Sequence, residues 1–330
     1  MPELPEVESV RRGLADHITG AAVRSLTVLD RRILGTTSQR DVPDASVPAL
    51  ASVLSGAALA EPQRRGKFLW VPFVSGLSPE PGGGVSPSRA LSLHLGMSGQ
   101  LRIHIPDEPL HRHTRAVLDL ESPSLREPLS LRRAGTNSAG AEGESAPGGS
   151  GRFQLRFLDQ RIFGHLGADA LVADGPDLIP SSIAHIARDP LDPHWELEAT
   201  ARRMQRSRSA VKAVLMDQRV VSGVGNIYAD EALHRAGVHP LAVPARTRIS
   251  RLRRVLEEAR TVMAEALAQG GTSFDALYVH VNGDSGYFSR SLRVYGRAGG
   301  ECLQCGEPVR RIVVGGRGTH FCPRCQPPQR

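Results

Sequence analysis

The spacing of hydrophobic and polar positions changes twice along the chain, and it predicts a helix, then strands, then helices again. Near the N-terminus, Val7, Val10, Leu14 and Ile18 recur every three or four residues, so a helix is expected over 5–17, with Gly20 ending it. The spacing then shortens towards alternation, which is typical of strands. Strands are expected over 22–29, 68–74, 91–95, 101–105, 115–120 and 152–158.

This order of elements predicts an α+β fold. Several short strands after one helix favour an antiparallel β-sandwich or a barrel, and the sandwich is our prediction. Segments 75–89 and 121–151 are rich in Ser, Pro, Gly and Ala. They are predicted to be flexible low-complexity insertions between strands.

Beyond residue 180 the spacing is helical. A wide apolar stripe over 252–267 predicts a buried helix that ends at Gly270, and 199–219 is predicted to be a basic helical segment. A glycine turn over 222–225 leads into a further helix, which Asn226 is expected to cap. Glycines between two helices let backbone N–H groups approach a phosphate closely, so this turn is a candidate phosphate site.

The cysteines predict a metal site close to the C-terminus. They follow a C-x2-C, sixteen residues, C-x2-C pattern formed by Cys302, Cys305, Cys322 and Cys325. That spacing is typical of one tetrahedral zinc, whereas a redox pair is less favoured and disulfides are not expected in a reducing cytosol. Four thiolates close the coordination shell, so the zinc is predicted to be structural. Between the pairs, 309–318 is predicted to form a β-hairpin that turns at Gly315 and Gly316.

The charge of the chain favours a polyanionic partner. Net charge is +7 with a pI near 9.8, which favours nucleic acid ahead of an anionic membrane surface. Among the 41 basic residues only Lys67 and Lys212 are lysine. They are either chance survivors on a solvated surface or candidates for positions where the chemistry needs an amine rather than a guanidinium. No apolar run approaches a membrane span, and the acidic N-terminus lacks a signal-peptide core, so a cytosolic protein is expected.

Short motifs in a fixed order resemble the formamidopyrimidine-DNA glycosylase family, which repairs oxidised purines. The resemblance covers nearly the whole chain except the two insertions. It rests on MPELPEVE (1–8), RGKFL (65–69), HLGMSG (94–99), DQRIFG (159–164), GVGNIYA (223–229), QGGTS (269–273), GYF (286–288), VYGR (294–297) and the cysteine hairpin. It implies a β-sandwich catalytic domain (1–179), a helix–two-turn–helix DNA-binding domain (180–270), and a lesion loop with a zinc finger (271–330).

The resemblance implies that Pro2 is the nucleophile. Removal of Met1 would expose a secondary amine with a pKa of about 8, which is partly neutral near pH 7. Such an amine can attack the sugar C1′, expel the base and leave an iminium. Glu3 would shuttle protons, Lys67 would act as general acid in elimination, and Arg317 would grip phosphates around the lesion and assist δ-elimination.

The same resemblance implies how DNA is held. Flipping a base out of a duplex leaves a gap, which Met97, Arg161 and Phe163 would fill, with Arg161 pairing with the orphaned cytosine. Phosphates or the damaged strand would be contacted by His113, Arg206, Arg208, Lys212 and Asn226. The chain departs from the family pattern at Ile162, which removes one phosphate contact, and at Asp284, which makes the lesion preference less certain.

The sequence therefore predicts a bifunctional glycosylase and AP lyase of base excision repair that removes 8-oxoguanine and formamidopyrimidines. Its expected partner is damaged double-stranded DNA, on which it acts as a monomer with one zinc ion. One alternative is an endonuclease VIII-like enzyme for oxidised pyrimidines, which Leu4 and the Met97, Arg161 and Phe163 set disfavour. The other is a non-catalytic zinc-dependent DNA-binding protein, which the retention of Pro2, Glu3 and Lys67 disfavours.

Overall fold

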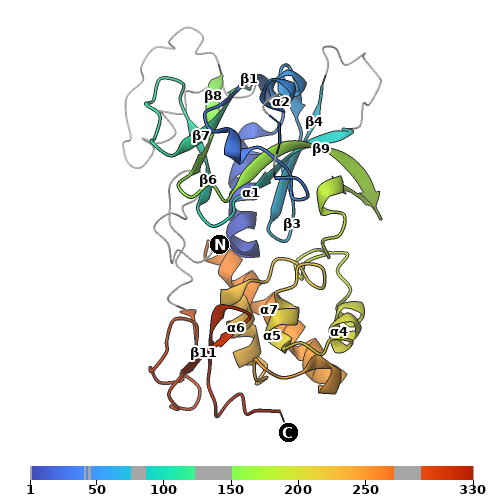
Figure 1. Ribbon diagram of the computed structural model, residues 1–330, viewed down its shortest axis with the longest axis vertical. Coiled ribbons are helices and arrows are strands. Elements are labelled where there is room, and N and C mark those ends of the chain that lie inside the picture. Colours follow the sequence, from blue (N-terminus) through green and yellow to red (C-terminus); the bar gives the residue numbers. More distant parts are fainter. Residues whose placement is uncertain are drawn as a thin grey trace, which may run out of the picture.

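Helix α1 (Leu4–Ile18) is shared by the two halves of the molecule. The computed structural model describes residues 2–40, 42–43, 46–75, 87–122, 151–270 and 291–329. Val7, Leu14 and Ile18 pack into the core of the upper, β-rich lobe, whereas Leu4 packs into the core of the lower, helical lobe (Figure 1). The predicted N-terminal helix is therefore confirmed, one residue longer at each end.

The β-rich lobe is built from one antiparallel sheet of ten strands in the described residues. The strand order is β10-β9-β5-β4-β2-β1-β7-β8-β6, and β3 pairs with β4. The strands are β1 (Ala22–Val28), β2 (Ala58–Leu59), β3 (Gln63–Arg65), β4 (Phe68–Val74), β5 (Arg89–His94), β6 (Gly99–His104), β7 (Thr114–Glu121), β8 (Arg152–Asp159), β9 (His165–Asp174) and β10 (Asp177–Pro180).

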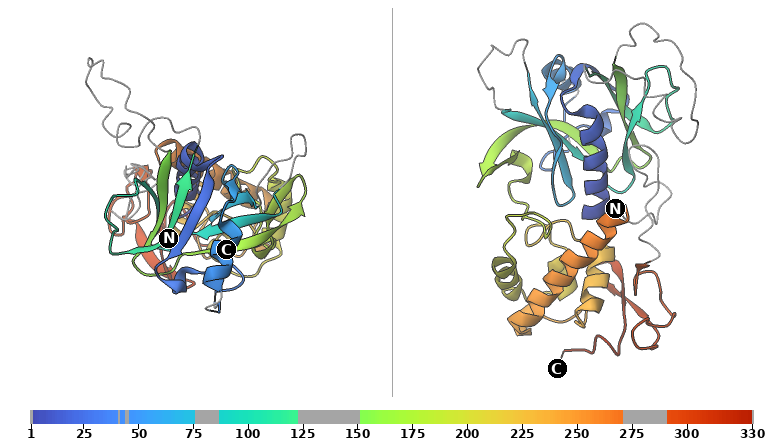
Figure 2. Two further views of the ribbon diagram at one scale, coloured as in Figure 1. Left: turned by 90° about the horizontal axis from the view of Figure 1, so that it is seen from above. Right: turned by 180° about the vertical axis from the view of Figure 1, so that it is seen from behind.

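The sheet is bent, so its two halves face each other with α1 between them (Figure 2, right). Phe73 and Leu91 from one half and Leu118 and Phe157 from the other belong to the same buried core, which confirms the predicted sandwich. Each predicted strand is present. Helix α2 (Ser46–Leu54), the short strands β2 and β3, and the pair β9 and β10 were not predicted.

The helical lobe contains α4 (Leu197–Gln205), α5 (Val211–Leu215), α6 (Asn226–Arg235) and α7 (Ile249–Ala268). The buried stripe predicted over 252–267 is confirmed: Leu252, Val255, Ala259, Val262 and Met263 all lie in its core. The prediction of one basic helical segment over 199–219 is wrong. The segment instead contains two helices, α4 and α5, and Arg206 and Arg208 lie in the connection between them.

A two-stranded hairpin, β11 (Arg310–Val314) and β12 (Arg317–Phe321), packs beside α6 (Figure 1). Arg310 pairs with Phe321 and Val314 with Arg317, which leaves Gly315 and Gly316 as the turn. Both glycines have positive φ values, 56° and 74°, so the predicted hairpin is confirmed with its turn. One cysteine pair precedes β11 and the other follows β12, so both lie at the open end of the hairpin, opposite the turn.

Among the residues that the structure describes, no helix is long and apolar enough to cross a membrane. Most of both predicted insertions, and Asp284 with the GYF motif, lie outside the described residues.

Candidate active site

The carboxylate of Glu3 lies at the N-terminus of α6. Its oxygens accept hydrogen bonds from the backbone N–H groups of Gly225 (2.6 Å), Ile227 (2.8 Å) and Tyr228 (3.3 Å). These are the groups that a helix start leaves unpaired, so Glu3 performs the capping that we predicted for Asn226. The prediction for Asn226 is wrong because it is the first residue of the helix rather than its cap. Because these amides already donate to Glu3, they are not available to the phosphate that we predicted would bind at this glycine turn.

Glu3 is buried, and this changes its acidity. Burial raises the pKa of Glu3 to about 7, and the neighbouring Glu6 charge adds to the rise, whereas Lys67 and the helix amides oppose it. Glu6 is held in turn by the Glu3 backbone N–H (2.9 Å) and the Tyr228 hydroxyl (2.7 Å). A carboxyl with a pKa near 7 exchanges protons readily at neutral pH, which suits a general acid and base.

Lys67 lies in the turn between β3 and β4 and reaches the same glycine turn as Glu3. Its Nζ donates to the Val224 carbonyl at 2.9 Å, next to the Gly225 amide that Glu3 binds. Burial lowers the pKa of Lys67, an effect that the Arg317 charge increases and the Glu3 charge opposes. Two consecutive residues, Val224 and Gly225, thus bring the predicted acid and amine together.

Close packing of glycines makes this arrangement possible. A Cβ atom on Gly225 would lie 2.4 Å from Cδ of Glu3, and one on Gly223 would lie 2.7 Å from Cδ1 of Leu4. The Leu4 N–H also donates to the Gly223 carbonyl at 3.1 Å. Pro2 precedes Glu3 and is buried, so the first described residues are fixed against the 223–225 turn.

Arg317 and Lys212 approach the site from the hairpin and from α5. Arg317 is exposed at the start of β12, and its charge contributes to lowering the pKa of both Lys67 and Lys212. Lys212 is 1 % exposed and pairs with Asp230 at 2.6 Å, while its Nζ also donates to the Thr319 hydroxyl at 2.8 Å. Its ammonium therefore joins α5 and α6 to the hairpin, and the contact between Lys212 and DNA stays a prediction.

Met97, Arg161 and Phe163 lie on two loops that pack against each other. Met97 and Phe163 are 39 % and 47 % exposed, although both are large apolar side chains. A Cβ on Gly96 would come within 2.5 Å of the Phe163 carbonyl carbon, which shows how closely the loops pack. The three side chains predicted to fill the gap in the duplex therefore lie on the protein surface rather than in the core. We call these two exposed loops the Met97 and Phe163 rim.

Asp159 holds these loops in place. Its Oδ1 accepts from the Ser98 hydroxyl (2.5 Å) and the Arg161 N–H (3.0 Å), and its Oδ2 accepts from the Gly164 N–H (2.7 Å). Between them, Ile162 has a φ of 57°, which is strained for a β-branched residue. Only a loop fixed at both ends retains such a conformation.

The remaining predicted DNA contacts are distributed over both lobes. The His113 carbonyl accepts from the Asp159 N–H at 2.9 Å, so His113 lies near the Met97 and Phe163 rim. Arg206 and Arg208 are exposed in the helical lobe. Asn226 is half-buried, and its Nδ2 donates to the Gly318 carbonyl at 3.0 Å, next to Arg317.

His94 belongs to the site, although our sequence analysis gave it no role. Its ring centroid lies 5.2 Å from that of Phe68, which follows Lys67, and 5.1 Å from that of His165. Burial lowers the pKa of His94 to about 4, helped by the Arg40 and Lys67 charges, so the ring is neutral at physiological pH. The one available signal was its position as the first residue of the HLGMSG motif.

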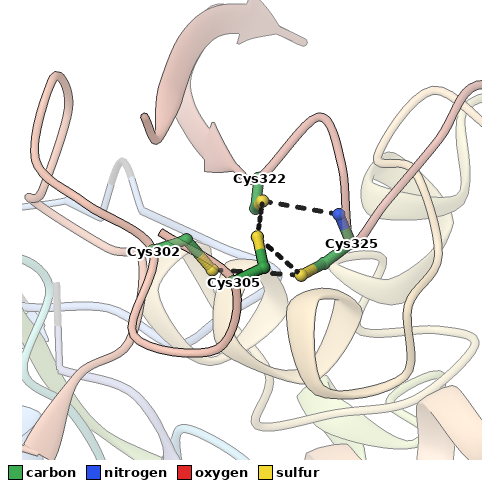
Figure 3. Close-up of side chains that lie close together, drawn as sticks. All are labelled: Cys302, Cys305, Cys322 and Cys325. Carbon is green, nitrogen blue, oxygen red and sulfur yellow. Dashed lines mark hydrogen bonds between the residues drawn. The ribbon is translucent and has the colours of Figure 1, made fainter. Parts of the chain in front are cut away.

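The four cysteines form a compact cluster at the open end of the hairpin (Figure 3). Their sulfur atoms all lie within 4.8 Å of one another, and neighbouring pairs are separated by 3.4–3.9 Å. Zn–S bonds of about 2.3 Å place tetrahedral sulfurs about 3.8 Å apart, so the cluster fits one structural zinc held by Cys302, Cys305, Cys322 and Cys325.

Residues 1–166 match the formamidopyrimidine-DNA glycosylase N-terminal domain, residues 186–276 match its H2TH domain, and residues 299–328 match a zinc finger found in FPG and IleRS. The formamidopyrimidine-DNA glycosylase of Nocardioides sp. is 46% identical over 330 residues, covering 100% of this chain and 96% of the relative. That of Rhodococcus jostii is 43% identical over 331 residues, covering 100% and 97%.

Solved structures give the same match. A complex between Lactococcus lactis Fpg and DNA containing an abasic site has a TM-score of 0.73 at 25% identity, covering 99% of this chain and 100% of that one. A mutant of the same protein bound to DNA containing Fapy-dG has a TM-score of 0.75 with the same identity and coverage.

Proposed function

The chain belongs to the formamidopyrimidine-DNA glycosylase family, and from that premise we propose that Pro2, Glu3 and Lys67 form its reaction centre. The protein is a glycosylase of base excision repair, and the strand-cleaving lyase activity is consistent with its family. One observation carries the assignment of residues: Lys67 and Glu3, the residue after Pro2 in the chain, are held by consecutive residues of one turn. The proposed lesions are 8-oxoguanine and formamidopyrimidines in duplex DNA.

Base removal begins at Pro2 once Met1 has been removed. The nitrogen lone pair forms a bond to C1′ while the glycosidic bond breaks, and the bonding electrons leave with the base, which takes up the proton that the amine nitrogen loses. Glu3 then protonates the ring oxygen O4′, which opens the sugar and leaves an iminium between nitrogen and C1′. With a pKa of about 7, Glu3 is present in both protonation states at neutral pH and serves this step and its reverse.

Strand cleavage follows from the positive charge of the iminium. Because the iminium withdraws electrons, loss of the C2′ proton expels the 3′ phosphate, and a second elimination expels the 5′ phosphate. Lys67, whose pKa is lowered by burial, is proposed to donate a proton during elimination. Arg317, exposed at the hairpin, is proposed to hold the departing phosphate. Water then hydrolyses the iminium and restores the amine.

The duplex is proposed to lie against both lobes. Met97, Arg161 and Phe163 enter the gap left by the flipped base, and Arg161 pairs with the orphaned cytosine. His113, Asn226, Arg206 and Arg208 contact phosphates, which gives binding that weakens with salt. The zinc supplies no chemistry to the reaction; it fixes the hairpin that carries Arg317.

We assign the β-sandwich catalytic domain to 1–179, the DNA-binding helical domain to 180–270, and the lesion loop with the zinc finger to 271–330. The protein is proposed to act as a monomer in the bacterial cytosol. Its curated relatives are bacterial and named for formamidopyrimidine removal, which favours this activity over the endonuclease VIII-like alternative. One Lactococcus lactis FPG structure contains DNA with an oxidized pyrimidine, so such a lesion belongs in any substrate panel.

Borohydride trapping tests the reaction centre. The enzyme is mixed with a duplex containing 8-oxoguanine opposite cytosine, and borohydride reduces any iminium to a stable amine. We expect a covalent protein–DNA adduct that peptide mapping places on Pro2, and a Glu3→Gln variant that forms it much more slowly. Absence of an adduct would favour the non-catalytic DNA-binding alternative, and an adduct on Lys67 would refute the role of Pro2.

A further inference from the structure

Helix α6 presents a row of polar side chains to the zinc hairpin. Asn226, Asp230 and His234 are spaced by four residues and so lie on one face of the helix. Asn226 donates to the Gly318 carbonyl, and Asp230 accepts from the His320 backbone N–H at 2.8 Å. The last member of the row, His234, reaches the metal cluster itself.

His234 and Cys302 form a buried contact between two groups that are 1 % and 2 % exposed. The His234 Nε2 atom lies 3.4 Å from the Cys302 sulfur, which is hydrogen-bonding distance for sulfur. A zinc-bound thiolate has lone pairs but no proton, so the nitrogen must be the donor. The other ring nitrogen, Nδ1, is buried without a hydrogen-bonding partner among the described residues. The bond to sulfur is therefore the polar contact of this imidazole that the structure shows.

We propose that His234 is a positioning residue of the zinc centre, donating its Nε2–H to the Cys302 thiolate. The assignment goes beyond the four ligands, because it makes α6 part of the metal site. One helix then links the zinc at its C-terminal end to the Glu3 carboxylate at its N-terminal end.

The chemistry of the cluster explains why a donor is useful there. Four thiolates around Zn²⁺ carry a net charge of −2, and two of these cysteines are buried. An N–H donor aimed at one sulfur disperses part of that charge and makes the thiolate harder to protonate. It also fixes the direction in which the sulfur points, which is the usual effect of a hydrogen bond to a metal ligand.

Zinc affinity of the full-length, zinc-loaded protein tests the proposal. His234→Phe keeps a ring of similar size but removes the donor, and His234→Gln keeps an N–H at a similar reach. Competition with a chromogenic chelator is expected to show affinity lowered by about 10–100-fold for the Phe variant, the usual loss for such partners, and largely restored for Gln. His239→Phe is the matched control, because His239 packs on Phe321 with ring centroids 4.8 Å apart and is expected to leave affinity unchanged.

A spectroscopic measurement separates hydrogen bonding from packing. With Co²⁺ in place of zinc, the sulfur-to-metal charge-transfer bands respond to the electron density on sulfur. Loss of the N–H donor raises that density, so the bands are expected to move to lower energy in His234→Phe but not in His234→Gln or His239→Phe. His234→Leu serves in the same comparison if the Phe variant does not fold.

Two results would overturn the proposal. One is wild-type affinity and wild-type bands in the Phe or Leu variant. The other is an equal loss of affinity in the Phe and Gln variants with unmoved bands, which would show that the imidazole only fills space.

Discussion

Substitution of Gly225 by Ala offers a sharp test of the site because it adds one methyl group and nothing else. The φ of Gly225 is −124°, which alanine adopts without strain. The new Cβ would lie 2.4 Å from Cδ of Glu3, whereas ordinary contacts begin at 3.4 Å. The Glu3 carboxyl must therefore retreat by about 1 Å, since the other atoms near this Cβ also belong to Glu3.

That displacement stretches the hydrogen bonds from Gly225 and Ile227 to Glu3, now 2.6 and 2.8 Å long. A hydrogen bond to a charged group contributes about 1.5–3 kcal/mol. Misplacing a catalytic group by about 1 Å can cost about 100-fold in rate. We therefore expect Gly225→Ala to lower the rate of 8-oxoguanine removal by about two orders of magnitude while the protein remains folded.

Single-turnover kinetics with excess enzyme would measure this rate, and circular dichroism would check the fold. The double variant with Glu3→Gln supplies the control: if the methyl acts through Glu3, the two losses will not add. A Gly225→Ala enzyme with the wild-type rate would refute the assignment of Glu3, and fully additive losses would show that the methyl acts elsewhere.

Three further predictions concern Lys212, the segment 123–150 and Glu3. Lys212→Ala is expected to lower the free energy of unfolding by about 3–5 kcal/mol, because it leaves buried Asp230 unpaired, and Asp230→Ala in the same chain should recover part of the loss in chemical denaturation. Deletion of 123–150 is expected to leave the melting temperature nearly unchanged, because the Ser122 N–H already donates to the Gly151 carbonyl at 2.9 Å; a large fall in calorimetry would contradict this. Finally, the raised pKa of Glu3 means that the folded state holds a proton which the unfolded chain releases above about pH 4.5, so stability should decline from there to about pH 7 and then level off. Denaturation of wild type and Glu3→Gln across that range should show the difference, and parallel curves would contradict it.

The sequence predicted correctly those elements that depend on contacts between residues close together in the chain. The stripes of α1 and α7, the strands β1 and β4 to β8 and the cysteine spacing were all predicted from sequence, because each is fixed by near neighbours in the chain. Strands β2 and β3 have two and three residues, too few to show alternation. Their pairing with β1 and β4 depends on the sheet as a whole.

The site itself depended on contacts between distant residues. Glu3 caps a helix that begins more than 220 residues later, and that contact displaced Asn226 from its predicted role. The family resemblance predicted that Lys212 contacts DNA, whereas its partners in the structure lie on α6 and the hairpin, and no spacing in the sequence joins them. The motifs thus identified the candidate residues, whereas the partners that each residue contacts depend on parts of the chain that are far apart in sequence.

The shared helix α1 has a practical consequence for anyone who produces this enzyme. Only Pro2 and Glu3 precede the helix among the described residues, and Leu4 is already locked against Gly223. Residues added before Pro2 would convert its proposed nucleophilic amine into an amide. If Pro2 is the nucleophile, as proposed, affinity tags and fusion partners belong at the C-terminus, and leader sequences must be cleaved to leave Pro2 first. A preparation with uncut N-termini would bind zinc and fold while containing few competent molecules, so active-site titration should precede any comparison of rates.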